Sequence, residues 1–250
     1  MAGKLLIIGT PIGNMSDMGG RALEHLGSVD IVACEEPKET KKLFFHYEIP
    51  FPKRFVKCND GNEKASANGI LKLLEQGETV GLCSSAGMPG ISDPGFRVVS
   101  TAIENNIEID VIPGPSAMTT ALVGSGLPSS SHLFLGFPPR KPVRQKKMLE
   151  QEKTTPHTLI FYISPRHIKE FLDIALTVLG DRVAAVAKDL TKKYQRFYRG
   201  RISEILLELG EEDFKGEAVV LLAGFNKRET EEEEEEEHPF NQLPARRSSR

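Results

Sequence analysis

The first half of the chain alternates short apolar runs with segments whose apolar residues recur at helical spacing. The runs are rich in branched residues and end abruptly at polar residues, glycine or proline, which is typical of strands buried in a parallel sheet. Between two of them, Ile70, Leu71 and Leu74 fall on one helix face. This alternation predicts a parallel α/β sheet. The expected strands are 4–8, 29–34, 55–58, 79–83 and 107–112, and the expected helices are 21–26, 39–47, 63–75 and 94–104.

The pattern of apolar and polar residues changes in the second half, after a helix that is expected to begin near Pro115 and to end near residues 124–126. This change predicts a boundary near Ser116, with α/β domains over residues 1–115 and 116–225 and a ligand cleft between them. The tail, 226–250, contains seven consecutive glutamates, which repel one another, so we expect it to be disordered. The other strands expected are 132–137, 158–163, 183–187, 195–199 and 218–223, and the other helices are 144–152, 167–178 and 203–209.

Three loops rich in glycine and proline follow strands of the first half. They read GTPIGN (9–14), SSAGMPGISDPG (84–95) and PGPSA (113–117). Ligands of open α/β sheets bind at the carboxyl ends of strands. Glycine lets backbone approach a ligand closely and proline fixes φ. The three loops therefore predict a cleft in which backbone holds a ligand, without a P-loop or a GxGxxG motif.

Composition narrows the class of protein. Three cysteines, Cys34, Cys58 and Cys83, lie far apart in apolar runs, which favours buried reduced thiols over disulfides or a zinc site. The six histidines include no metal-binding pair at i, i+4. No apolar stretch reaches the roughly 20 residues of a membrane span, and the start lacks a signal core. We expect a cytoplasmic protein with no metal and no membrane contact.

Two basic segments stand out in a chain of formal net charge −3. Residues 140–147 (RKPVRQKK) carry five cations and no acid, and residues 188–201 combine six cations with three aromatic residues. Such mixtures suit RNA, because cations meet phosphates and rings stack on unpaired bases. The alternative is a solvated helix face and an edge strand.

The order of motifs resembles that of a known family. The motifs extend from about residue 4 to residue 224 and occur in this order: GTPIGN, CEEPKETKKLF, NEK, SSAGMPGISDPG, IPGPSA, GSGLP, GFPPRK, LIFYISP and KGEAVV. The series is similar to the tetrapyrrole methylase superfamily and, more narrowly, to the ribosomal RNA small subunit methyltransferase I family. The resemblance implies two α/β domains with S-adenosylmethionine in the cleft between them, and a homodimer. It also implies methylation of a cytidine ribose 2′-hydroxyl in the decoding region of 16S rRNA, within the small ribosomal subunit.

The resemblance also implies site residues. Cofactor contacts are expected from the three loops and from two positions of the second domain: Pro11, Ser84, Ser85, Ala86, Gly87, Ser116, Ala117, Tyr162 and Leu190. Substrate contacts are expected at two asparagines near the loops and within the two basic segments: Asn14, Asn62, Arg140, Lys141, Lys192 and Lys193.

A ribose hydroxyl is a weak acid, so a base must take its proton as the new bond forms. The candidates are Glu36 and Glu63 as proton acceptors, with Lys38 holding a phosphate or lowering the pKa of a neighbour. Either glutamate could instead be a solvated surface acid.

Departures from the family pattern leave alternatives open. Relatives usually read Ser-Asp-Ala-Gly-Thr-Pro where this chain has Ser84 to Pro89 with Ser85 and Met88, and Glu-Asp-Thr-Arg where it has Glu35-Glu36-Pro37-Lys38. The carboxylate expected beside the cofactor is missing at Ser85. A catalytically weakened RNA-binding relative is the main alternative function, followed by a tetrapyrrole methyltransferase and a methylase of the diphthine type.

Overall fold

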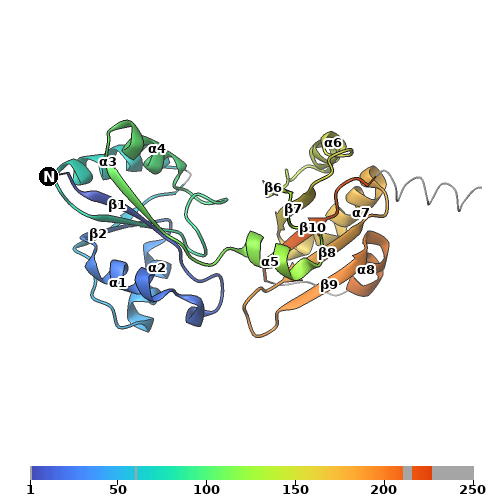
Figure 1. The fold of residues 1–250 in the computed structure, drawn as a ribbon, viewed down its shortest axis with the longest axis horizontal. Coiled ribbons are helices and arrows are strands. Elements are labelled where there is room, and N and C mark those ends of the chain that lie inside the picture. Colours follow the sequence, from blue (N-terminus) through green and yellow to red (C-terminus); the bar gives the residue numbers. More distant parts are fainter. Residues whose placement is uncertain (1, 60, 211–215, 227–250) are drawn as a thin grey trace, which may run out of the picture.

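The computed structural model describes residues 2–59, 61–210 and 216–226. It contains two five-stranded sheets placed side by side, joined by the chain as it leaves β5 and enters α5 (Figure 1). The α/β class predicted from the sequence is confirmed. Nearly all of the tail predicted to be disordered lies outside the described residues.

The first sheet is parallel throughout, as its apolar runs predict. Its strands are β1 (Lys4–Ile8), β2 (Ile31–Cys34), β3 (Arg54–Lys57), β4 (Val80–Cys83) and β5 (Glu108–Ile112). They lie in the order β3-β2-β4-β1-β5, and every pair is parallel. The three loops of the sequence analysis therefore leave three adjacent strands, β4, β1 and β5, at one edge of the sheet.

Helices cover both faces of this sheet, which explains why β2 and β4 are buried along their whole length. Leu26 of α1 (Gly20–Ser28) and Phe44 of α2 (Pro37–His46) pack on one face. Ile70 of α3 (Glu63–Glu75) and Val98 of α4 (Phe96–Glu104) pack on the other. Since a strand buried on both faces has no polar side, a continuous apolar run is the expected sequence signal.

The second sheet is mixed, which the sequence did not predict. Its strands are β6 (His132–Gly136), β7 (Thr158–Ile163), β8 (Val183–Lys188), β9 (Arg196–Arg201) and β10 (Ala218–Leu222). The order is β6-β7-β10-β8-β9. Only β6 and β7 are parallel, whereas β10 runs antiparallel to β7 and β8, and β8 antiparallel to β9.

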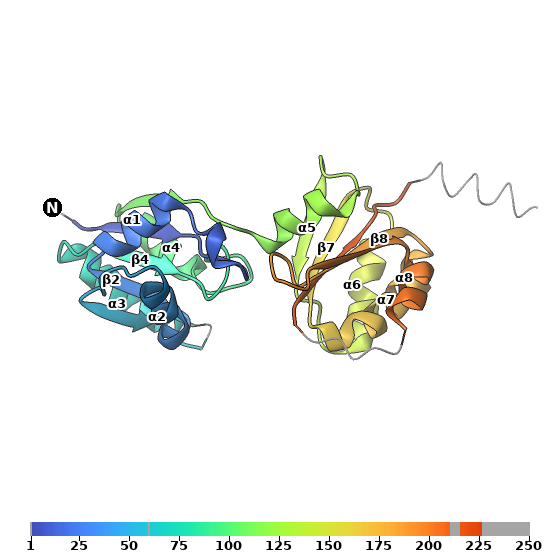
Figure 2. The same ribbon diagram turned by 90° about the horizontal axis from the view of Figure 1, so that it is seen from below.

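The two faces of the second sheet are covered unequally. The helices α6 (Pro142–Gln151), α7 (Ile168–Leu179) and α8 (Ile202–Leu209) pack on one face around Phe161 and Phe171 (Figure 2). The single helix α5 (Ala117–Ser125) packs on the other face. Ile12, from the loop after β1, joins that second core, so the first loop reaches into the second half of the molecule.

Several element ends differ from the sequence prediction for local reasons. The helix predicted from residue 94 begins at Phe96, because Gly95 with φ 150° is its N-cap. The helix predicted from residue 39 begins at Pro37, a residue suited to the first helical turn. Two short 3₁₀ helices, η1 (Met15–Asp17) and η2 (Pro165–His167), were not predicted. The boundary near Ser116 falls between β5 and α5 and stays a prediction.

Among the described residues, no group of three or more His, Cys, Asp or Glu side chains is arranged to hold a metal ion. No helix in the same part of the chain has the length and apolar character needed to cross a membrane. The three cysteines are buried and are not joined in disulfides. Burial raises the pKa of the Cys83 and Cys34 thiols, which keeps them protonated and unreactive at neutral pH.

Candidate functional site

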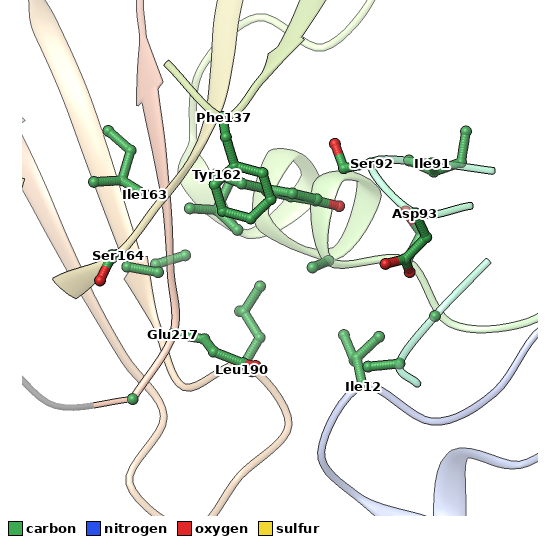
Figure 3. Close-up of a pocket in the computed structure, with 18 of the residues that line it drawn as sticks. Ile12, Ile91, Ser92, Asp93, Phe137, Tyr162, Ile163, Ser164, Leu190 and Glu217 are labelled. Carbon is green, nitrogen blue, oxygen red and sulfur yellow. The ribbon is translucent and has the colours of Figure 1, made fainter. Parts of the chain in front are cut away.

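A cavity of about 420 Å³ lies between the two sheets, at the edge where the three loops leave β1, β4 and β5. Its size falls within the range of about 300 to 1,000 Å³ that is usual for small-molecule sites. Figure 3 shows side chains of both halves pointing into it. The first half contributes Ile12 and residues 85–88 and 91–93, and the second contributes 116–117, 137, 162–165, 187, 190 and 216–219.

Close backbone contact holds the three loops together. The Thr10 N–H donates to the carbonyl of Gly87 at 2.9 Å, and the Gly87 N–H donates back to the carbonyl of Thr10 at 3.1 Å. A Cβ atom at Gly9 would stand 2.7 Å from the backbone of Gly114, and one at Gly114 would stand 2.8 Å from that of Gly9. Only glycine on both loops permits this approach.

The loop between β4 and α4 has an unusual backbone. Gly87, Gly90 and Ser92 all have positive φ, at 84°, 81° and 58°, and a serine in this region is uncommon. Ser85 donates its hydroxyl to the Glu35 carboxylate at 3.2 Å. A carboxylate therefore lies next to position 85 although the residue at 85 is not aspartate.

Glu63 anchors the far end of the same loop. Its carboxylate oxygen accepts the N–H of Gly95 at 2.9 Å and the N–H of Arg97 at 3.1 Å. Its side chain is only 14% exposed. Carboxylates that accept the first N–H groups of a helix stabilise it through both hydrogen bonds and the helix dipole. Glu63 thus caps α4 from a helix that lies about thirty residues earlier in the chain.

Aromatic side chains form the wall on the side of the second sheet. The hydroxyl oxygen of Tyr162 accepts the N–H of Met118 at 3.1 Å, in the first turn of α5. The ring of Tyr162 packs against Phe134 and Phe137, at centroid distances of 4.8 and 5.6 Å. Burial raises the pKa of Tyr162, so its hydroxyl stays protonated at neutral pH and can donate a hydrogen bond into the cavity.

Two acidic residues line the cavity, and they differ in their surroundings. The Glu217 carboxylate is 2.7 Å from the ammonium of Lys192. Asp93 belongs to the loop before α4, and its carboxylate points into the same part of the cavity as the Tyr162 hydroxyl (Figure 3). The negative charge of Asp93 also contributes to the raised pKa of Tyr162. Because its carboxylate points toward the same part of the cavity as the Tyr162 hydroxyl, Asp93 is a candidate to accept a proton from a bound group.

Comparison with known proteins identifies the family. The model of the family described as Tetrapyrrole (Corrin/Porphyrin) Methylases matches residues 4–206. The chain is 40% identical over 222 residues to "Ribosomal RNA small subunit methyltransferase I" of Halalkalibacterium halodurans, covering 89% of this chain and 76% of that protein. It is 39% identical to the Thermotoga maritima protein of the same name, covering 89% of this chain and 99% of that protein. The chain belongs to the ribosomal RNA small subunit methyltransferase I family.

A solved structure shares the fold of this family member. The uroporphyrin-III C-methyl transferase of Thermus thermophilus, crystallised with S-adenyl homocysteine, aligns with a TM-score of 0.60. The alignment covers 88% of this chain and 97% of that protein, at 15% identity. At this identity the likeness concerns the fold, two α/β halves of the tetrapyrrole methylase type.

The cavity of this family member contains most of the residues predicted to bind cofactor. Two of that set lie beneath the lining instead. Pro11 is buried in the first loop, and Ser84, 3% exposed, donates its hydroxyl to the carbonyl of Gly87 at 3.1 Å. The predicted residues that line the cavity are Ser85, Ala86, Gly87, Ser116, Ala117, Tyr162 and Leu190.

The residues predicted to be catalytic lie outside the cavity lining. Glu36 pairs with Lys57 at 3.1 Å, and this hydrogen bond lowers the pKa of Glu36, which makes it a weaker base. Lys38 is exposed on the first turn of α2. Glu63 caps α4 as described above. Their roles in catalysis stay predictions, and the contacts of Glu63 assign it a positioning role.

The predicted substrate residues fall into two groups. Four of them have internal partners: Asn14 caps η1, Asn62 donates to the carbonyl of Lys57, Lys192 pairs with Glu217, and the Lys193 ammonium lies 5.4 Å from the ring of Tyr194. The other two, Arg140 and Lys141, are exposed immediately before α6.

Sequence reasoning missed several lining residues. Ser92 and Asp93 belong to the middle loop, directly before the helix predicted from residue 94, and neither was expected to contact the ligand; the N-cap of that helix is Gly95. Phe137 belongs to the GFPPRK motif, in which only Arg140 and Lys141 were predicted to contact a ligand. Ala187 and Val219 lie in β8 and β10, where a small apolar residue gives the same signal in a core as in a cavity wall.

A pair of substitutions separates positioning from proton transfer at Glu63. We expect Glu63→Ala to lower stability by about 1 kcal/mol, the usual cost of losing a helix cap, and to weaken cofactor binding because loop 84–95 loses its anchor. Glu63→Gln keeps an acceptor oxygen and should restore both. Urea denaturation and calorimetry measure the two effects. Loss of methyl transfer in Glu63→Gln with cofactor binding intact would instead identify Glu63 as the base.

Proposed function

We propose that this protein is an S-adenosylmethionine-dependent methyltransferase that methylates a cytidine ribose 2′-oxygen in the decoding region of 16S rRNA. The observation that carries the proposal is the convergence of the loops after β1, β4 and β5 with Tyr162 and Leu190 in one cavity. The 40% identity to proteins named ribosomal RNA small subunit methyltransferase I supports the rRNA substrate.

The cavity fits S-adenosylmethionine in size and chemistry. Its walls are mainly apolar, with polar groups from Ser85, Ser116 and Tyr162 at separate points. This combination suits a ligand that has a flat base at one end and charged groups at the other. Ile12, Ala117 and Leu190 would pack against the base, and the backbone of residues 85–87 would bind the polar end. When bound, the cofactor supplies an electrophilic methyl group on a sulfonium sulfur.

The residues of the chain then have two tasks. The walls hold the ribose oxygen in line with the methyl group and exclude water, and this positioning supplies most of the catalysis. Asp93 accepts the proton of the 2′-hydroxyl as the carbon–oxygen bond forms. The Tyr162 hydroxyl points into the same part of the cavity and helps to orient the ribose.

A patch of exposed cations that begins three residues after a residue of the cavity lining supports an RNA substrate. Arg140, Lys141, Arg144, Lys146 and Lys147 are all exposed on α6 or just before it. Phe137, three residues before Arg140, lines the cavity and is 64% exposed. Within residues 2–59, 61–210 and 216–226, none of the five cations forms an ion pair with an acidic side chain. Their charge is therefore available to phosphates.

The second basic segment is largely occupied by structural contacts. Arg199 donates twice to the carbonyl of Gly124, and Arg196 pairs with Glu208 at 2.8 Å. Lys192 pairs with Glu217. The interpretation of this segment as a solvated edge strand therefore fits better than a role in RNA binding. We place the main phosphate contacts at residues 140–147.

The proposal is tested by methyl transfer from labelled S-adenosylmethionine to 30S subunits that lack the modification. We expect label in 16S rRNA, recovered after nuclease digestion as 2′-O-methylcytidine by mass spectrometry. Label on another nucleotide or on a base would contradict the substrate assignment. Binding of cofactor without transfer would also contradict it, and no binding of cofactor would support the alternative of a catalytically weakened RNA-binding relative.

A further inference from the structure

A second hollow lies on the first half of the molecule, away from the candidate site. It has a volume of about 590 Å³ and runs between α2 and the edge strand β3. None of the residues that line it is acidic. We call it the α2–β3 groove. Its lining combines three aromatic and three cationic side chains: Phe45, Phe51, Phe55, Lys41, Lys53 and Arg54.

The aromatic rings of the groove are unusually exposed. Phe45 is 70% exposed and Phe51 is 48% exposed. Their rings meet edge to face with centroids 5.0 Å apart. Phe51 in turn stacks on the buried Phe44, at 5.6 Å and an interplanar angle of 13°. The buried ring of Phe44 thus holds the ring of Phe51 in place, while the adjacent ring of Phe45 remains open to a flat ligand. Such exposed rings mark contact surfaces.

The cations of the groove are suited to an anionic partner. The Lys41 ammonium lies 5.3 Å from the ring centre of Phe55. Lys53 is held by Asp30 and Glu78, each at 3.0 Å. In the part of the chain that the structure describes, Lys41 and Arg54 form no ion pair with an acidic side chain. Two uncompensated cations therefore flank the exposed rings.

We propose that the α2–β3 groove binds single-stranded RNA, with bases on Phe45 and Phe51 and phosphates near Lys41 and Arg54. This inference rests on the proposed function for the identity of the strand. Aromatic rings interleaved with cations are the usual design of surfaces that bind unpaired nucleotides. A second copy of the chain is a poorer occupant, because a two-fold symmetric contact between two such grooves would bring the cations of both copies together, and the lining offers no acidic side chain to pair with them.

The groove is also connected to the candidate site. Pro37, Lys41 and Phe45 occur at intervals of four along α2 and so lie on one helix face. They span about 12 Å along the helix axis, at 1.5 Å per residue. Pro37 opens α2 only two residues after Glu35, which accepts the hydrogen bond from Ser85 of the cavity. An RNA strand bound at the cavity can therefore extend along α2 into the groove.

The test measures the fluorescence anisotropy of a fluorescein-labelled oligouridylate of 12 nucleotides with the full chain. We expect Phe45→Ala and Phe51→Ala each to weaken binding about fivefold or more, as removal of a stacking ring does. Lys41→Gln should reduce the slope of log affinity against log salt by about 0.7. Phe96→Ala is the matched control, because Phe96 is 73% exposed on α4 and outside the groove. Circular dichroism checks the folding of each variant.

Three outcomes decide the matter. Weaker binding of the oligonucleotide by both groove variants, with unchanged binding of a 12-base-pair RNA duplex, supports the proposal whether or not the protein methylates 30S subunits. Affinity equal to that of Phe96→Ala would overturn it, even if methylation of 16S rRNA is established. A change of molecular mass by light scattering in Phe45→Ala would also overturn it, because the groove would then be a contact between copies of the chain.

Discussion

We expect the Gly114→Ala protein to bind S-adenosylmethionine about 100-fold more weakly than the natural protein, a loss of the same order as the fall in reaction rate when a site is displaced by about 1 Å. The added methyl group would stand 2.8 Å from the carbonyl carbon and Cα of Gly9 and 3.0 Å from its oxygen. Backbone surrounds it, so no side-chain rotation can relieve the contact. The loops after β1 and β5 must separate, and Ser116 and Ala117 move with them.

Calorimetric titration with the cofactor measures this loss. Gly69→Ala is the control, because a Cβ at this position in α3 meets no atom within 4 Å. Alanine in a helix interior should stabilise the protein by about 0.5 to 1 kcal/mol and leave cofactor binding unchanged. Equal cofactor affinity of Gly114→Ala and Gly69→Ala would show that the close approach of the loops does not shape the site.

The second large effect is expected at Asp93. Asp93→Asn should lower the rate of methyl transfer about 100- to 10,000-fold, the usual contribution of a general base, while the dissociation constant of the cofactor changes little. Asparagine keeps the size of the side chain but cannot accept the ribose proton. Single-turnover transfer to 30S subunits, with calorimetry beside it, separates the two quantities.

Two glutamates serve as controls for Asp93. Glu217→Gln changes the other acid of the cavity, whose carboxylate pairs with Lys192. Glu36→Gln changes an acid outside the lining that pairs with Lys57. Both variants should transfer methyl groups within a few-fold of the natural rate. If Glu36→Gln were the inactive variant, proton transfer would belong to the loop after β2, as the sequence had suggested.

The sequence predicted the first sheet well because its signal is local. Strands such as β2 and β4 are buried on both faces, so every residue contributes to one apolar run. The antiparallel placement of β10 between β7 and β8 left no such signal, because the direction of a strand is set by its neighbours in the sheet and not by its own residues.

The site was harder to predict than the first sheet because many of its contacts join residues that are far apart in the sequence. The loops could be recognised because glycine and proline mark special backbone wherever they occur. The contact of Glu63 with Gly95 joins residues 32 positions apart, and nothing near Glu63 in the sequence indicates it. Asp93 was not among the predicted site residues, since a local pattern cannot show that a carboxylate points toward the same part of a cavity as a tyrosine from the second sheet.

Ile12 lies in the first half of the sequence but packs in the hydrophobic core of the second half. By sequence it belongs to the first loop, yet it is 7% exposed within the core beneath α5, beside Leu190 and Val219. A fragment beginning at residue 116 would keep the whole second sheet but would lack the Ile12 side chain, and the apolar surface that Ile12 covers would be exposed to water. The two halves would then be poor candidates for separate expression. A ligand bound against Ile12 would contact both halves at once and so couple their stabilities. We therefore expect thermal unfolding of both halves in one transition when the cavity is filled.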